Sequence, residues 1–218
     1  MQNFELYSYY RSSASYRVRI ALNLKGAEYK LNAVNLVKEG GEQLSPQYRK
    51  LNPSAQVPTL IHGKNTIGQS MAIIDYLDAV IPEPKLISKD LYTRALQIQA
   101  CEIINSGVQP LHNLSTLKQL EVQAGFNQEK KDLWLVHWIT NGMQTFDNFI
   151  DKKAKKFCFG DEVSIVDCFM MPGFFNIQRY QIDESKFPNC MRIAKNCLDL
   201  EAFQKAHPNA QPDFPQPK

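Results

Sequence analysis

The first eighty residues change the period of their apolar positions several times. Residues 4–10, FELYSYY, are typical of a strand, and the apolar positions from Ala14 to Leu24 recur at helical spacing. Residues 28–36, EYKLNAVNL, again favour a strand. This order predicts a βαβ unit whose two strands are parallel.

A connecting segment and a second group of elements follow. Residues 37–56 are dense in Gly, Pro and Ser and are expected to form a loop. Residues 57–63 and 65–70, VPTLIHG and NTIGQS, predict a short hairpin, and residues 71–80, MAIIDYLDAV, predict a helix. The complete order, β-α-β and then β-β-α, defines a first domain over residues 1–82.

The rest of the chain keeps one period. The segment Ile81–Asp90 contains two prolines and mixed charge, which places a linker at residues 83–89. In residues 90–218, apolar positions recur about every 3.6 residues over long segments. We therefore expect an α+β protein whose second domain, residues 90–218, is an all-helical bundle.

Composition excludes several classes of protein. The chain has 218 residues, of which 44% are hydrophobic, enough for one large or two modest domains. Its 25 basic and 22 acidic side chains are interleaved, so the net charge of +3 indicates neither a nucleic-acid nor a membrane partner. The five cysteines form no Cys-x-x-Cys pair and lie in apolar segments. Together with an N-terminus that lacks the features of a signal peptide, they indicate reduced thiols, no metal site and a cytoplasmic protein.

Two arginines lie on the helix predicted from Ala14 to Leu24. At about 100° per residue, Arg19 shares the polar sector with Ser15 and Asn23 and is expected to be solvated. Arg17 falls on the apolar side and in the first turn, where the helix dipole disfavours a cation. It therefore needs a partner, which is either an internal carboxylate or an anionic ligand at the helix start, and the sequence leaves both open.

Ser12 and Ser13 lie where this helix begins and where several backbone N–H groups lack partners. A serine in that position is most often an N-cap. One hydroxyl suffices as a cap, so the other is free to donate to a ligand. A hydroxyl in front of a helix N-terminus would lower the pKa of a thiol from about 8.5, and that thiol need not belong to the protein.

A second helix start carries a similar arrangement. Gln69 and Ser70 precede the helix, and no Glu or Gln completes a capping box, so its N–H groups are available to a carboxylate. Val57 precedes Pro58 at a strand start, where proline is tolerated and a cis bond would be a deliberate feature. The backbone beside such a bond can pair with a peptide by strand addition. Two anion sites beside such an edge suit a small acidic peptide that carries a thiol.

These motifs resemble those of the glutathione transferases. The order of elements, QVP before the hairpin and QS at the next helix are similar to their thioredoxin-like domain, and the helical remainder is similar to their second domain. More narrowly, SSASYRVRIAL resembles the zeta-class signature Ser-Ser-Cys-x-x-Arg-Val-Arg-Ile-Ala-Leu. LNPSAQVPTL, GQSMAIIDYL, GVQPLHNLSTLKQL and LEAFQKAHPNAQPD also resemble that class, so the similarity covers nearly the whole chain. Ala14 stands where the family has Cys, which puts in doubt only the side chemistry of that protein thiol.

A further motif lies in GDEVSIVD. Ser164 and Asp167 predict a capping box, with Asp in place of Glu, for a helix that begins at Ile165. Glutathione transferases carry such a box in their helical domain. We interpret it as a folding element and not as a catalytic one.

The resemblance implies roles for individual residues. Ser12 would donate to the thiolate of glutathione, with Ser13 lining the same turn. Substrate carboxylates would be bound by Arg179, with Arg17 as a weaker candidate. The remaining contacts to glutathione, with Gln109 also facing substrate, would come from Gln43, Val57, Gln69, Ser70, Gln109, Asn113, Leu114 and Ser115.

The implied activity is a glutathione-dependent cis–trans isomerisation of maleylacetoacetate to fumarylacetoacetate, in tyrosine and phenylalanine breakdown, by thiolate addition, bond rotation and elimination. One alternative is a glutathione transferase, or an isomerase of another acid such as maleylpyruvate. A second alternative is a non-catalytic binding protein of the same fold. The expected partners are glutathione, a small dicarboxylic diketo-acid and a second copy of the chain in a homodimer.

Overall fold

The computed structural model describes residues 3–215 and divides into two compact units. The first unit runs through Leu86 and includes the chain again from Leu198, and the second is Ile87–Cys197. The division at Leu86 falls inside the linker predicted at residues 83–89. The predicted second domain extended to residue 218, whereas the chain from Leu198 packs with the first unit.

The first unit contains a four-stranded sheet with the order β2-β1-β3-β4. Strand β1 (Phe4–Ser8) pairs in parallel with β2 (Tyr29–Ala33) and antiparallel with β3 (Thr59–His62). Strand β4 (Asn65–Gly68) completes a hairpin with β3. The predicted β-α-β, β-β-α order is confirmed, with strands somewhat shorter than expected.

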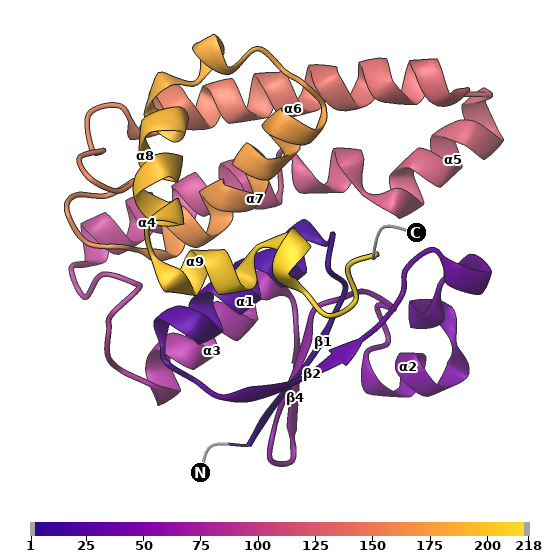
Figure 1. Ribbon diagram of the computed structural model, residues 1–218, viewed down its shortest axis with the longest axis horizontal. Coiled ribbons are helices and arrows are strands. Elements are labelled where there is room, and N and C mark those ends of the chain that lie inside the picture. The colour runs from indigo at the N-terminus through magenta and orange to yellow at the C-terminus, as the bar shows by residue number, and fades with distance from the viewer. Residues whose placement is uncertain (1–2, 216–218) are drawn as a thin grey trace. The chain divides into compact units, whose positions relative to one another are not determined.

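Helices cover both sides of this sheet. Helices α1 (Ser13–Leu24) and α3 (Ser70–Val80) lie together on one side, and α2 (Pro46–Leu51) lies on the other (Figure 1). Helix α9 (Glu201–Ala206), from the end of the chain, packs on α1. It is followed by the short 3₁₀ helix η5 (Pro208–Ala210).

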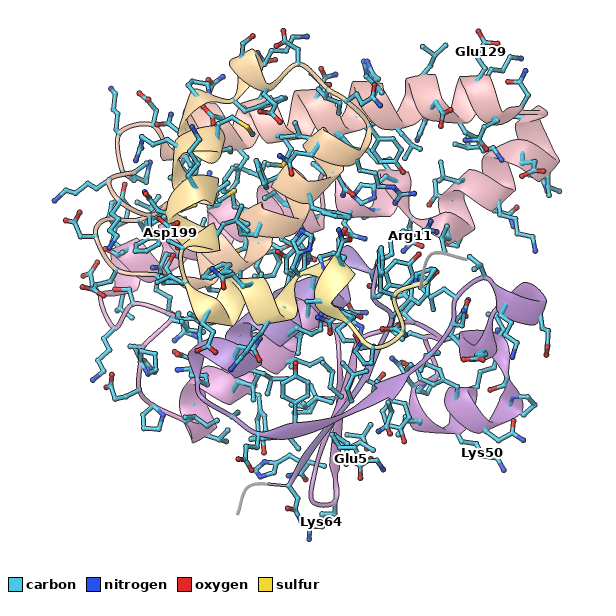
Figure 2. The ribbon with its side chains drawn as sticks, viewed as in Figure 1. Glu5, Arg11, Lys50, Lys64, Glu129 and Asp199 are labelled. Atoms are coloured by element: carbon cyan, nitrogen blue, oxygen red, sulfur yellow. The ribbon has the colours of Figure 1, made fainter. Side chains whose placement is uncertain are left out.

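The expected loop at residues 37–56 is not a loop throughout. It contains η1 (Lys38–Gly40), η2 (Glu42–Leu44) and helix α2. Helix α2 begins because Ser45 accepts the Tyr48 N–H and a proline occupies the first helical position. The Ser-Pro signal for this helix was present in the sequence. Lys50 on α2 and Lys64 in the β3–β4 turn extend away from the body of the unit (Figure 2).

The second unit is helical, as predicted, and its elements are α4 (Leu91–Asn105), η3 (Gln109–His112), α5 (Leu114–Ala124), α6 (Gln128–Ile150), α7 (Ile165–Arg179), η4 (Glu184–Lys186) and α8 (Pro188–Leu198). Helix α7 is buried over most of its length and packs against α4 and α6. Helical spacing alone did not show the break between α4 and α5. In residues 3–215 no helix is both long and apolar enough to span a bilayer.

The predicted capping box begins α7. Ser164 Oγ accepts the Val166 N–H at 3.2 Å, and Asp167 Oδ2 accepts the Ser164 N–H at 2.8 Å. Asp167 Oδ1 also accepts the Cys158 N–H at 2.9 Å. Burial raises the pKa of Asp167. Its partners inside the core confirm that Asp167 is a folding element.

All five cysteines are buried and free of disulfides, as expected of core thiols: Cys101, Cys158, Cys168, Cys190 and Cys197. Burial raises the pKa of Cys158, Cys190 and Cys197. These three thiols are therefore held in the unreactive protonated form.

A buried ion pair ties the start of the linker to the first unit. Lys25 Nζ lies 2.6 Å from Asp78 Oδ1 and also donates to Pro84 O at 2.5 Å. The same carboxylate oxygen accepts the Leu86 N–H at 2.8 Å. Residues 83–86 are thus anchored by specific hydrogen bonds.

Candidate functional site

The turn between β1 and α1 places Ser12 at the N-cap of α1. The Ser12 backbone has φ −67° and ψ 118°, and its Oγ accepts the Ser15 N–H at 3.2 Å. A hydroxyl that accepts a hydrogen bond still carries its own hydrogen, so Ser12 can cap the helix and donate to a ligand together. The sequence predicts one serine for each task, whereas the geometry allows Ser12 to do both. Ser13, the first residue of α1, is half-buried.

The start of α3 presents backbone N–H groups without protein acceptors. Gln69 is the N-cap, has φ 67° and makes no capping hydrogen bond through its side chain. Within residues 3–215 the N–H groups of Ser70, Met71 and Ala72 have no acceptor. Three such groups at the positive end of a helix dipole have the geometry of an anion site. Gln69 is exposed, so solvent reaches this helix start.

Arg17 connects the two helix starts. It is the fifth residue of α1, so it lies in the second turn and not in the predicted first turn. It has no exposed surface, and it donates from Nη1 to Ser70 Oγ at 3.2 Å. Its predicted inward orientation is confirmed. A cation behind the start of α3 strengthens the positive field that an anion would meet there. Arg17 is fully buried and contacts Ser70, and its predicted role toward a substrate stays a prediction.

The prediction that Arg19 is solvated was wrong. Its side chain is fully buried. It donates to Ala206 O at 3.0 Å, Ser8 Oγ at 3.0 Å, Tyr9 O at 3.3 Å and Tyr10 O at 3.0 Å. The cause is α9, which covers the face of α1 that a helical wheel assigns to solvent. Burial lowers the pKa of Arg19 to about 10, which leaves it charged at neutral pH.

The backbone N–H and C=O groups of Val57 lie next to a cis peptide bond. The Val57–Pro58 bond is cis, and Val57 lies two residues before the start of β3. In the described part of the chain, neither the N–H nor the C=O of Val57 has a hydrogen-bond partner. A free donor and acceptor on one residue beside a strand can pair with a peptide by strand addition.

A polar network fixes the residue before Val57. Tyr48 Oη and Asn52 Nδ2 donate to Gln56 O at 2.7 and 2.9 Å. Both groups also contact Thr59 Oγ1, at 2.9 and 3.0 Å. Burial raises the pKa of Tyr48, so its hydroxyl remains a donor. Sequence reasoning missed Tyr48 and Asn52, although their i, i+4 spacing after Ser-Pro was a signal that they share a helix face.

Gln43 lies on η2 and is half-buried. Its Oε1 atom is buried and has no hydrogen-bond partner among the described residues. Buried amide oxygens in proteins are nearly always bonded, so this atom is an acceptor in need of a donor. The contact between Gln43 and a bound peptide stays a prediction.

The second unit carries the other predicted contacts around η3 and the start of α5. Gln109 begins η3 and is half-buried. Asn113 is the N-cap of α5, where its Oδ1 accepts the Ser115 N–H at 3.3 Å. This leaves the Asn113 NH₂ group as the donor for a ligand. Leu114 is 39% exposed and Ser115 is exposed.

Arg179 is the last residue of α7 and is exposed. Its Cζ lies 5.0 Å from the centre of the Tyr180 ring, so the guanidinium stacks on an aromatic face. Stacking of this kind leaves the N–H edge of the guanidinium free to bind a carboxylate.

A thioredoxin-like sheet unit with polar helix starts, joined to a helical unit, is the architecture of a glutathione S-transferase. The model of the glutathione S-transferase N-terminal domain matches residues 2–79. Over 210 residues, the chain is 45% identical to maleylacetoacetate isomerase of Rattus norvegicus, which covers 96% of this chain and 94% of that protein.

Solved structures agree with this similarity. A maleylpyruvate isomerase described as a bacterial glutathione S-transferase of the zeta class has a TM-score of 0.92 and 34% identity, covering 97% of this chain and 100% of that chain. Maleylacetoacetate isomerase of Anaeromyxobacter dehalogenans 2CP-1, with glutathione bound in its active site, has a TM-score of 0.88 and 35% identity, covering 99% and 100%. The chain belongs to the glutathione S-transferase family, in its zeta class.

Proposed function

We propose that this protein is a glutathione-dependent cis–trans isomerase that converts maleylacetoacetate to fumarylacetoacetate. The 45% identity to a maleylacetoacetate isomerase over 96% of the chain supports this substrate. The observation that carries the proposal is the pairing of a Ser12 hydroxyl at one helix start with three N–H groups without acceptors at the next. These groups suit a thiolate and a carboxylate of one small peptide.

The first unit has the groups that glutathione would need. The γ-glutamyl carboxylate would bind the N–H groups at the start of α3, beside Ser70, with Gln69 covering it. The N–H and C=O of Val57 would pair with the cysteinyl residue of the peptide. Gln43 would accept a hydrogen bond from a peptide N–H. The residues present therefore fit the cofactor.

Glutathione supplies a thiolate that can add to an activated double bond and leave again. The contribution of Ser12 is to donate a hydrogen bond to that sulfur, so that the charged form is favoured. The N-terminus of α1 adds its dipole at the same place. Ser13 lines the turn, and Arg17 keeps Ser70 in position and adds positive charge behind it.

The second unit would contribute the contacts to the substrate. Arg179 would bind a substrate carboxylate through the free edge of its guanidinium. Gln109, Asn113 and Ser115 would donate and accept hydrogen bonds to the substrate or to glutathione. In this proposal residues 1–82 bind the cofactor, residues 83–89 link the two domains, and residues 90–218 include the residues that contact the substrate.

The deciding assay uses maleylacetoacetate and maleylpyruvate, each with and without glutathione, and follows the loss of substrate absorbance. We expect isomerisation of maleylacetoacetate only when glutathione is present. Activity on maleylpyruvate alone would support the second candidate, which the likeness to a maleylpyruvate isomerase favours. Activity on neither acid would overturn the isomerase and favour conjugation or binding.

Three variants of Ser12 separate its cap from its donor role. Ser12→Asp keeps a capping acceptor but offers no hydroxyl, so we expect it to keep stability and lose about 100-fold or more in kcat. Ser12→Thr keeps the hydroxyl and should retain most activity. Ser12→Ala should lose both. Full glutathione-dependent activity in Ser12→Ala would remove Ser12 as the activator.

We also propose a cytoplasmic homodimer. Leu91 and Tyr92, at the start of α4, are 82% and 73% exposed, which is unusual for two adjacent large apolar residues. They would be covered by a second copy of the chain. Light scattering should give twice the chain mass, and Leu91→Lys with Tyr92→Lys should reduce it to the monomer.

A further inference from the structure

The turn that carries Ser12 is contacted by residues 206–214, near the end of the described part of the chain. Tyr10 N–H donates to Asp213 Oδ2 at 2.8 Å, across 203 residues of sequence. The C=O of Tyr10 accepts from Arg19 Nη2 at 3.0 Å. The same guanidinium donates from Nε to Ala206 O. The N–H of Tyr10 is thus bound directly by Asp213, and its C=O is connected to Ala206 through the side chain of Arg19.

Packing adds to these hydrogen bonds. The ring of Phe214 meets the ring of Tyr10 edge-on, with centroids 5.5 Å apart and planes at 90°. Tyr10 in turn packs against Tyr9 at 4.7 Å. The segment is itself well fixed, because Gln211 is buried and donates to Lys205 O and His207 O.

One atom connects this contact to Ser12. The carbonyl oxygen of Tyr9 accepts from Arg19 Nη1 at 3.3 Å and from the Ser12 N–H at 3.0 Å. The position of Ser12 therefore depends on the guanidinium that also binds Ala206. A donor to a reacting sulfur must be placed within about 0.5 Å, so what fixes this turn matters for the chemistry.

We propose that residues 206–214 form a clamp on the β1–α1 turn, in which Asp213 and Arg19 are positioning residues that hold the Ser12 hydroxyl toward the thiol of glutathione. The clamp rests on the proposed function, since it assigns Ser12 to that thiol. Its residues touch neither glutathione nor substrate, and they act through the backbone of Tyr9 and Tyr10.

The test compares Asp213→Ala, Asp213→Asn and Glu201→Ala. Asn can still accept the Tyr10 N–H, so Asp213→Asn should behave like the unaltered protein. Glu201 lies in the same part of the chain, in an exposed ion pair with Lys205, and is the matched control. Asp213 is only partly buried, so these variants are expected to fold.

The first readout is amide hydrogen exchange of residues 9–16 in the protein without glutathione. Asp213→Ala should increase exchange there by about tenfold and leave the start of α3 unchanged. The second readout is the pH titration of the thiol of bound glutathione, followed by the ultraviolet absorbance of the thiolate. Asp213→Ala should raise its apparent pKa by about half a pH unit, with the dissociation constant of glutathione changed by less than about twofold.

The outcomes separate the clamp from the proposed function. If the unaltered protein does not lower the thiol pKa of glutathione, the proposed function and the role of the clamp both fail. If it does, and Asp213→Ala changes neither readout, the clamp is wrong and the function stands. Faster exchange with an unchanged thiol pKa would show that the contact is merely structural, which also overturns the proposal.

Discussion

Arg17 and Arg19 lie in the same helix and are both fully buried, but they stabilise different features of the molecule. Arg19 donates mainly to carbonyl oxygens, and these belong to the β1–α1 turn and to α9. Arg17 donates to a hydroxyl at the start of α3. A buried arginine that is surrounded by carbonyl oxygens joins distant parts of the chain, whereas one behind a helix start adds to a field that a ligand can use.

The largest effect is expected from Arg19→Met. Methionine fills similar space but removes the guanidinium donor from the carbonyl oxygens of Ala206 and Tyr10, and leaves that of Tyr9 with the Ser12 N–H alone. Buried acceptors that lose a charged partner cost about 3–5 kcal/mol in the free energy of unfolding. Urea unfolding followed by circular dichroism would measure the loss.

Arg49→Met is the matched control for that variant. Arg49 is exposed and donates to one carbonyl, that of Leu44, at 3.2 Å. Its substitution should leave the unfolding free energy unchanged, because water replaces the lost donor. An Arg19→Met protein as stable as Arg49→Met would show that the carbonyl contacts of Arg19 contribute nothing.

Arg17→Met should have its main effect on glutathione. Without the guanidinium, Ser70 loses its donor and the start of α3 loses a positive charge. We expect the dissociation constant of glutathione to rise about tenfold, or about 1.4 kcal/mol. Isothermal calorimetry would measure it in Arg17→Met, in Ser70→Ala and in the double variant.

The cycle of these variants tests whether Arg17 acts through Ser70. If it does, the two changes are not additive, and a coupling of about 1 kcal/mol remains. A second cycle that pairs Ser70→Ala with Arg49→Met should be additive. Additivity in both cycles would contradict the role of Arg17 as a residue that positions Ser70.

The two arginines also differ in whether their burial could be predicted from the sequence. The orientation of Arg17 followed from the wheel alone, because its acceptor lies on a neighbouring helix that the sequence also predicts. Arg19, Ser15 and Asn23 share a polar sector, yet Ser15 is buried and Asn23 donates to Ala202 O at 2.9 Å. Helix α9 covers this sector from a place almost 180 residues along the chain, and no local pattern contains that information.

The residues of the candidate site also differ in whether the sequence alone could identify them. Helix starts follow from local rules, so Ser12, Gln69 and Ser70 could be selected from the sequence. The residues that support the Val57 backbone could not be identified from the sequence. The hydrogen bonds of Tyr48 and Asn52 depend on where a short helix folds back against the strand. The cis bond at Val57 was only a possibility until the backbone was placed.

Tyr48→Phe tests a neutral donor that, like Arg19, binds a backbone carbonyl oxygen. Phenylalanine removes the bond to Gln56 O while Asn52 Nδ2 keeps its own, so we expect a loss of about 1 kcal/mol in unfolding free energy. Glutathione should bind about threefold more weakly, since the Val57 backbone is less well fixed.

Tyr76→Phe separates those two effects. The Tyr76 hydroxyl lies 2.8 Å from His62 Nδ1 in the same unit, away from Val57. Its loss should reduce stability by a similar amount and leave glutathione affinity unchanged. Equal affinity losses in both variants would mean that Tyr48 acts only through general stability.

The smallest effect concerns His207, which follows α9. Burial lowers the pKa of His207, and the positive charge of Arg19 lowers it further. Arg19→Met removes the second cause, so His207 should titrate a few tenths of a pH unit higher, whereas Arg19→Lys keeps the charge and should not move it. Because the folded pKa lies below the unfolded one, the unfolded chain binds the proton first, and stability falls as pH drops through about 6.5. Nuclear magnetic resonance titration of the His207 ring checks the shift, and an equal shift in Arg19→Lys would assign it to loosened packing rather than to charge.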